Sequence, residues 1–210
     1  MSERTVSVSA TGQAQATPDM ASISTGVQTE AETARDAMAR NTVSMVKLID
    51  GLKGAGIDAK DIQTTTVNVS PRYTNPRDGK QPVINGYFAQ NQVRIVVRDL
   101  KKLGEILDAS LTLGATQMGG IAFEVSNAET LKDEARKAAM VNARRRAELY
   151  AAAAGASLGQ VISIAEDVRM AGPRPMLMGA RAASMQAEAV PVEVGSMKLE
   201  ATVHVTWSLR

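Results

Sequence analysis

Histidine and cysteine, two residue types that often carry out chemistry, are nearly absent from this sequence of 210 residues. It contains one histidine, His204, and no cysteine. The lack of cysteine excludes disulfides, thiolate nucleophiles and cysteine-ligated metal sites. A histidine base needs an orienting partner and a reacting group nearby, and the sequence around His204 indicates neither. We therefore expect no catalytic residue, no cofactor and no metal site, and we do not expect an enzyme.

The basic residues do not form a focused cluster for phosphate or nucleic acid. Lys and Arg number 24 against 22 Asp and Glu, which leaves a formal net charge of +2. The run Arg144-Arg145-Arg146 lies in a helical pattern, where three consecutive side chains spread over about 200°. No glycine-rich phosphate loop follows a predicted strand. We expect these arginines to be solvated and the protein to have no nucleic-acid partner.

The most unusual segment of the chain is rich in methionine and proline. Four of the eleven methionines lie between residues 170 and 185. Thioethers can hold Cu(I), and methionine also forms adaptable apolar contacts. An apolar segment of this kind needs cover, which its own core, another subunit or a protein partner could provide. The candidate residues of an oligomer or partner interface are Met170, Arg174, Met176, Leu177, Met178 and Met185.

Hydrophobic periodicity predicts the elements that must position these residues. Alternation with period two predicts strands, and apolar residues at steps of three and four predict helices. Thr29 and Glu32 have the spacing of a capping box, and Asp99 suits the start of a shorter helix. The predicted strands are 6–16, 21–28, 62–70, 83–98, 117–125, 161–166 and 199–209, and the predicted helices are 31–53, 100–113 and 127–154, with a turn at 71–82 and a loop at 169–190.

The order ββαββαβαββ predicts an α+β fold of antiparallel sheets with helices packed on one face. Residues 20–126 follow the ferredoxin-like order βαββαβ. Residues 1–19 with 127–210 would form a second, intimately associated α/β unit that joins the chain ends. In the last strand, we expect the odd-numbered residues from Leu199 to Leu209 to face the core. No apolar run reaches the ~20 residues of a membrane-spanning helix, so we expect none, while peripheral association with a cell envelope stays open.

Several short motifs occur in the order typical of one known protein family. Gly12, Pro18-Asp19 and Ala21 resemble the family's opening strand element. The further matching stretches are Ala55-Gly56-Ile57, Asp61-Ile62-Gln63-Thr64, Gly86-Tyr87, Val93–Leu100, Lys102–Asp108, Asp133–Arg136 with Ala138-Ala139, and Leu158–Val161. Together they cover nearly the whole chain. By this ordered set the sequence resembles a single SIMPL domain over residues 1–210, in the bacterial branch that includes the periplasmic immunogenic proteins.

The resemblance implies a protein for which no catalytic residue is established. Bacterial members are usually exported to the periplasm or associated with the envelope, and some look like ring or channel-like homo-oligomers. A role in stress tolerance is also implied, and animal members resemble signalling adaptors. We therefore expect a non-enzymatic periplasmic protein that self-assembles, with a monomeric protein-binding adaptor as the alternative. No signal-peptide pattern precedes the first strand, which fits either a cytosolic protein or a trimmed sequence.

Overall fold

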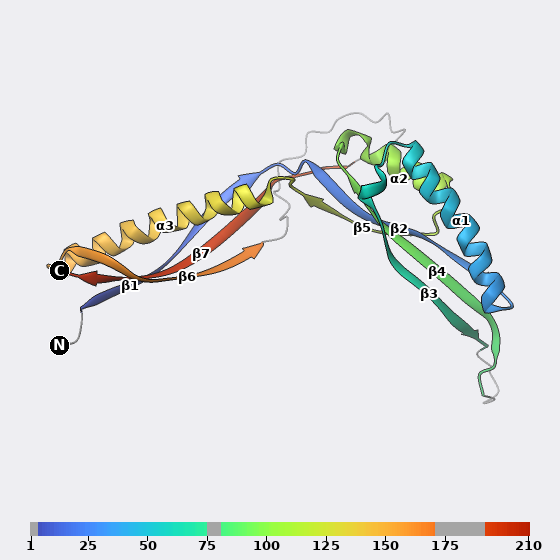
Figure 1. The fold of residues 1–210 in the computed structure, drawn as a ribbon, viewed down its shortest axis with the longest axis horizontal. Coiled ribbons are helices and arrows are strands. Elements are labelled where there is room, and N and C mark those ends of the chain that lie inside the picture. The colour runs from blue at the N-terminus through green and yellow to red at the C-terminus, as the bar shows by residue number, and fades with distance from the viewer. Residues whose placement is uncertain (1–3, 75–80, 171–191) are drawn as a thin grey trace, which may run out of the picture. The chain divides into compact units, whose positions relative to one another are not determined.

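The computed structural model describes residues 4–74, 81–170 and 192–210 (Figure 1). Its elements follow the predicted order ββαββαβαββ, with two short 3-10 helices added, and the strands form two antiparallel sheets. The predicted α+β fold class is therefore confirmed. The elements are β1 (Thr5–Ala16), β2 (Met20–Ala31), α1 (Ala34–Gly54), η1 (Ala59–Asp61), β3 (Ile62–Tyr73), β4 (Ile84–Val97), η2 (Leu100–Lys102), α2 (Leu103–Thr112), β5 (Gln117–Glu124), α3 (Ala128–Ala153), β6 (Leu158–Met170) and β7 (Met197–Leu209).

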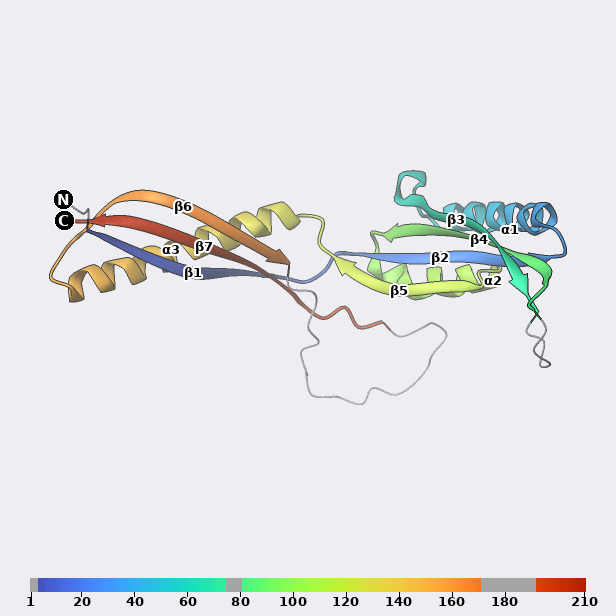
Figure 2. The ribbon, with the colours of Figure 1, turned by 90° about the horizontal axis from the view of Figure 1, so that it is seen from below.

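One compact unit contains Asp19–Glu124 and is built on a four-stranded sheet in the order β3-β4-β2-β5. Helices α1 and α2 cover one face of this sheet, so the strands lie in front of both helices in Figure 2. Its core includes Ile23, Leu48, Ile95 and Leu103, each at most 1% exposed. Burying an aliphatic side chain stabilises a fold by roughly 1.5–3 kcal/mol. Packing of the two helices on the sheet is therefore the main source of stability in this unit.

The other unit contains β1, α3, β6 and β7, with the sheet order β1-β7-β6. β1 and β7 pair in one unbroken antiparallel register, from Thr5 opposite Ser208 to Ala16 opposite Met197. In β7 the odd-numbered residues from Leu199 to Trp207 are buried and Leu209 is half-buried. The predicted core face of this strand is confirmed.

Helix α3 approaches β1 very closely because its buried face is built largely of alanine. A Cβ atom at Gly12 of β1 would lie 2.2 Å from both Ala135 O and Ala139 N of the helix. No side chain fits at this position, because backbone atoms of the helix cannot give way as a flexible side chain would. The buried residues of α3 recur at steps of four, namely Leu131, Ala135, Ala139, Ala143, Ala147 and Ala151.

The structure corrects the predicted start of the first helix. β2 continues to Ala31, and Thr29 lies opposite Ala89 of β4, so Thr29 and Glu32 form no capping box. The N-cap of α1 is Thr33, whose Oγ1 accepts a hydrogen bond from the backbone N–H of Asp36 at 3.1 Å. Extended ladder pairing outweighs a local cap here, because each further residue of β2 gains backbone hydrogen bonds to β4.

Strand β6 is also longer than predicted. Arg169 and Met170 were expected in a loop, but they belong to the strand, whose register with β7 continues to Met170 opposite Leu199. The rest of the predicted loop, 171–190, lies outside the described residues. Similarly, Asp99 caps the 3-10 turn η2, through Lys101 N, and α2 begins only after that turn. Within the described part of the chain, no helix is both long and apolar enough to cross a bilayer.

Candidate functional site

The candidate interface residues fall only partly within the described chain. Met170 is the last residue of β6. One residue of the predicted interface therefore lies at the end of this strand. Outside the described residues lie the other candidates, Arg174, Met176, Leu177, Met178 and Met185.

The structure also places the other residues whose side chains could take part in chemistry. His204 is exposed in β7 and lies opposite Ser9 of β1. Arg144 Nε donates a hydrogen bond to Glu148 Oε1 at 2.9 Å, an exposed pair one helical turn apart. Over residues 4–74, 81–170 and 192–210, no group of three or more His, Asp or Glu side chains is placed to hold a metal ion.

The two outer strands of the three-stranded sheet differ at their outer edges. At β1, two side chains of α3 reach over the edge. Asn142 Nδ2 donates to Thr11 O at 3.0 Å, and Arg146 Nη1 donates to Ser9 O at 2.9 Å. These bonds occupy carbonyl oxygens that an open edge would offer to another strand. Arg146, one of the three consecutive arginines, thus helps to close the edge of β1.

The outer edge of β6 is open in the described structure. The sheet ends at this strand, with no other described strand beyond it. Every residue from 160 to 167 is exposed. Among them are Val161 at 47%, Ile162 at 50% and Ile164 at 56% exposure. An open edge is a template for pairing with another chain, and β6 adds exposed apolar side chains to it.

A groove lies beside this edge, between α3 and β6. The helix packs mainly on β1 and β7, so the side of β6 that faces the helix stays largely uncovered. Val161 lies opposite Trp207 and Ile164 opposite Val205, so both side chains project to the helix side of the sheet. The groove has a volume of about 600 Å³ and is lined by Met140, Val141, Arg144, Glu148, Leu158, Gly159, Val161 and Trp207.

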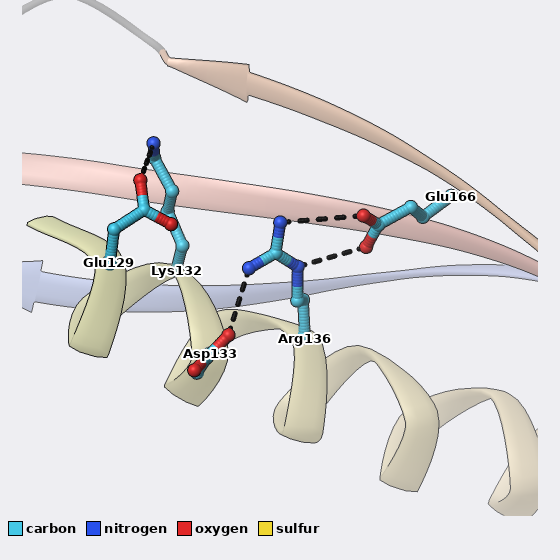
Figure 3. Close-up of polar contacts among 5 residues, drawn as sticks. All are labelled: Glu129, Lys132, Asp133, Arg136 and Glu166. Carbon is cyan, nitrogen blue, oxygen red and sulfur yellow. Dashed lines mark hydrogen bonds and ion pairs between the residues drawn. The ribbon is translucent and has the colours of Figure 1, made fainter.

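A cluster of ion pairs bridges α3 and β6 farther along the strand (Figure 3). Arg136 Nε donates to Glu166 Oε2 at 2.9 Å, and its Nη1 donates to Asp133 Oδ1 at 2.8 Å. The hydrogen bond to Glu166 and, to a smaller extent, the hydrogen bond to Asp133 raise the pKa of Arg136 above its ordinary value. Glu129 and Lys132 form a second pair one turn away. Exposed pairs of this kind add little stability, so the bridge is a minor contact between β6 and the helix.

In the other unit, Asp61 and Arg98 form a bidentate ion pair. Arg98 donates from Nε and Nη2 to the two carboxylate oxygens of Asp61, each at 2.7 Å. This hydrogen bonding is the main reason that the pKa of Asp61 lies below its ordinary value, although burial acts in the opposite direction. The side chain of Asp61 is only 6% exposed and that of Arg98 is 56% exposed. The pair links η1 to the residue that follows β4, and we interpret it as a structural interaction.

The surface at β6 is a finding of the structure that the sequence predictions did not include. Strand 161–166 was expected, but an edge position follows only from the strand order. Three of the four residues from Val161 to Ile164 are apolar, which was a usable signal, because a nearly continuous apolar run in a strand normally indicates burial on both faces. Here these side chains are about half exposed in the single chain. The sequence pattern of a buried strand therefore occurs here at an exposed position.

These features describe an α+β protein of two small units whose most distinctive described surface is one strand edge with its groove. The chain belongs to the SIMPL family, described as a protein of unknown function (DUF541), and the family model matches residues 6–207. The resemblance seen in the ordered sequence motifs is thereby confirmed. The match includes residues of both compact units.

Two groups of relatives illustrate the family. The chain is 36% identical to the 26 kDa periplasmic immunogenic protein of Brucella melitensis, over 98% of this chain and 84% of that protein. It is 31% identical to the uncharacterized protein YggE of Edwardsiella ictaluri, over 97% of this chain and 86% of that one. For YggE of Escherichia coli K12 the identity is 32%, over 88% of this chain and 72% of that one. None of these names states an enzymatic activity, and the Brucella name states a periplasmic location.

Proposed function

We propose that this protein is a non-enzymatic component of the periplasm or cell envelope that self-assembles into a homo-oligomer. The observation that carries self-assembly is the exposed apolar surface of β6 and its adjoining groove. Val161, Ile162 and Ile164 each keep about half of their surface in water. Covering the remaining half of each side chain would contribute roughly 1 kcal/mol, before the cost of ordering the partners.

The other parts of the proposal have separate support. A periplasmic location is supported by the name of the Brucella relative. A non-enzymatic role is supported by the single histidine and the lack of cysteine in the sequence. A role in stress tolerance is implied by the family resemblance alone. Fractionation of cells that express the complete natural gene would test the location, with recovery in the cytosol contradicting it.

The proposed interface also includes the methionine-rich segment that follows β6 in the chain. Because Met170 ends the strand, the chain passes directly from the exposed edge into this segment. Methionine suits an interface because its unbranched side chain adapts to irregular surfaces. The segment contributes Met170, Arg174, Met176, Leu177, Met178 and Met185.

Light scattering over a wide concentration range tests the self-assembly directly. We expect a particle larger than the 22.2 kDa chain at high micromolar concentration, with dissociation on dilution. Deleting residues 171–185 should reduce the average mass without changing the circular dichroism spectrum. A 22.2 kDa particle at every concentration would reject self-assembly and favour the monomeric adaptor. An unchanged mass after the deletion would place the interface outside the methionine-rich segment.

A further inference from the structure

Four strands lie at sheet edges in the described structure, and three of them carry features that hinder pairing with another chain. At β1, Asn142 and Arg146 occupy two edge carbonyls. β3 contains Pro71, which has no N–H to donate, and its register with β4 shifts at two places. β5 is eight residues long, includes Gly119-Gly120 and has an irregular register with β2. Proline, bulges and short length are known means of blunting an edge.

The edge of β6 is blunted only at its beginning. Its register with β7 shifts between Leu158 and Ser163 and is then continuous from Ser163 to Met170. The continuous part begins beside Ile164, which is 56% exposed. β6 is therefore the described edge that best combines regular pairing geometry with exposed apolar side chains.

We propose that β6 pairs, antiparallel and about a two-fold axis close to Ile164, with β6 of a second copy of this chain. The pairing joins two three-stranded sheets into one sheet of six strands. This inference rests on the proposed self-assembly and assigns one contact between two copies of the chain to the edge of β6. Head-to-tail pairing of β6 with β1 of another copy is disfavoured, because the helix side chains already occupy carbonyls at the edge of β1. The remaining choice is a pairing of like edges, which is isologous and closes at two subunits.

The charges of β6 disfavour an axis at Glu166 and permit one at Ile164. In that register Ser163 lies opposite Ala165, Ile162 lies opposite Glu166, and Ile164 lies opposite its own copy. A register centred on Glu166 would instead place two carboxylates directly opposite each other, which is unfavourable. Both α3 helices lie on the same face of the joined sheet, and the two Ile164 side chains meet at the axis on that face.

The size of this contact predicts a weak dimer. Residues 161–167 span about 23 Å of edge at about 3.3 Å per residue. Even at the roughly 10 Å thickness of a packed sheet layer, that is about 230 Å² per copy. Stable interfaces bury about 800 Å² per partner. The β6 pairing is therefore a weak association, and a stable assembly requires further contact surfaces in addition.

Cross-linking at an engineered cysteine tests the pairing, because the natural chain has no cysteine. In the variant Ile164→Cys, two thiols would meet across the axis and form one disulfide when a mild oxidant removes their two protons and two electrons. The matched control is Val67→Cys, since Val67 is 54% exposed on the edge strand β3. We expect at least tenfold more covalent dimer from Ile164→Cys than from Val67→Cys, at twice the 22.2 kDa chain mass on a non-reducing gel.

Three other outcomes would overturn the assignment. Equal cross-linking of the two variants would show that the thiols meet by random collision. A natural chain that is oligomeric by light scattering, with no cross-linking of Ile164→Cys, would leave the proposed self-assembly intact and place its interface elsewhere. A chain that is monomeric at every concentration and does not cross-link would reject the proposed function together with this edge.

Discussion

The strands β1 and β6 flank the same central strand, β7, but the outer edge of β1 is partly occupied by side chains whereas the outer edge of β6 is open in the described structure. Side chains of α3 occupy carbonyls of β1, whereas β6 presents exposed Ile162 and Ile164 beside an open edge. The position of the helix explains the difference. Gly12 and the alanines of α3 let the helix lie directly against β1, and a helix placed there leaves the helix-facing side of β6 uncovered. The small residues at the contact between α3 and β1 thus determine which edge of the sheet stays open to pairing.

The largest effect should follow from breaking the contact that holds α3 against β1. A valine at position 12 would place its Cβ 2.2 Å from backbone atoms of Ala135 and Ala139. We expect Gly12→Val to lower the free energy of unfolding by about 3 kcal/mol or more, because neither backbone can move without losing its packing. Urea unfolding followed by circular dichroism measures this. Gly120→Val is the control, since a Cβ at Gly120 meets nothing within 4 Å.

That prediction has a clear counter-result. If Gly12→Val is as stable as Gly120→Val, the close approach of α3 to β1 is not what positions the helix. The asymmetry between the two edges would then need another cause.

The next effect concerns the open edge itself. Ile164→Lys would place two like charges close to each other at the proposed axis, and we expect self-association to weaken about a hundredfold, or about 2.7 kcal/mol. Sedimentation velocity over a concentration series gives the dissociation constant. Val67→Lys makes the same change on the edge of β3, at 54% exposure against 56% for Ile164, and should leave the constant unchanged. Equal effects of the two substitutions would mean that net charge, and not the β6 edge, controls association.

A smaller effect should follow from opening the edge of β1. The double variant Asn142→Ala/Arg146→Ala removes both side-chain bonds to this edge. We expect a loss of about 1–3 kcal/mol in the free energy of unfolding, at about 0.5–1.5 kcal/mol for each bond. Arg145→Ala is the control because Arg145 is an exposed neighbour in the same run. A double variant as stable as Arg145→Ala would show that these bonds do not close the edge of β1 in solution.

The smallest effect concerns the ion pair of Asp61 and Arg98 in the other unit. Asp61→Asn should lower the free energy of unfolding by about 1 kcal/mol at neutral pH, because the partner Arg98 is half exposed and water screens the pair. Since the pKa of Asp61 is lowered by folding, its contribution is present above the unfolded pKa of about 3.9 and is lost as pH falls through the folded pKa. Self-association should be unchanged. A stability difference between wild type and variant that grows on acidification would contradict this assignment.

Much of the fold could be predicted from the sequence because it rests on local periodicity. The alternation from Leu199 to Trp207 correctly indicated the core face of β7, and the four-residue spacing of alanines indicated the longest helix. The start of α1 was predicted wrongly, at Thr29 in place of Thr33, because a cap depends on where the preceding strand stops pairing. That pairing is a contact with a strand far along the chain, which local patterns do not contain.

The candidate surface could not be predicted for the same reason. The open edge of β6 depends on strand order and on the position of α3, and both follow from contacts between distant residues. The bonds from Asn142 to Thr11 and from Arg146 to Ser9 join residues 131 and 137 positions apart in the sequence. The methionine-rich segment is distinctive by composition alone, and its role at an interface stays a prediction.

Hydrogen exchange at two protein concentrations tests the difference between the two edges most directly. One peptide should cover residues 161–167 of β6 and the other residues 5–16 of β1. We predict that raising the concentration from low to high micromolar slows exchange in the β6 peptide, because pairing with a second copy protects its edge amides. Exchange in the β1 peptide should not change with concentration. Slower exchange in β1 alone, or no change in either peptide while the particle mass rises, would contradict the assignment of the open edge to β6.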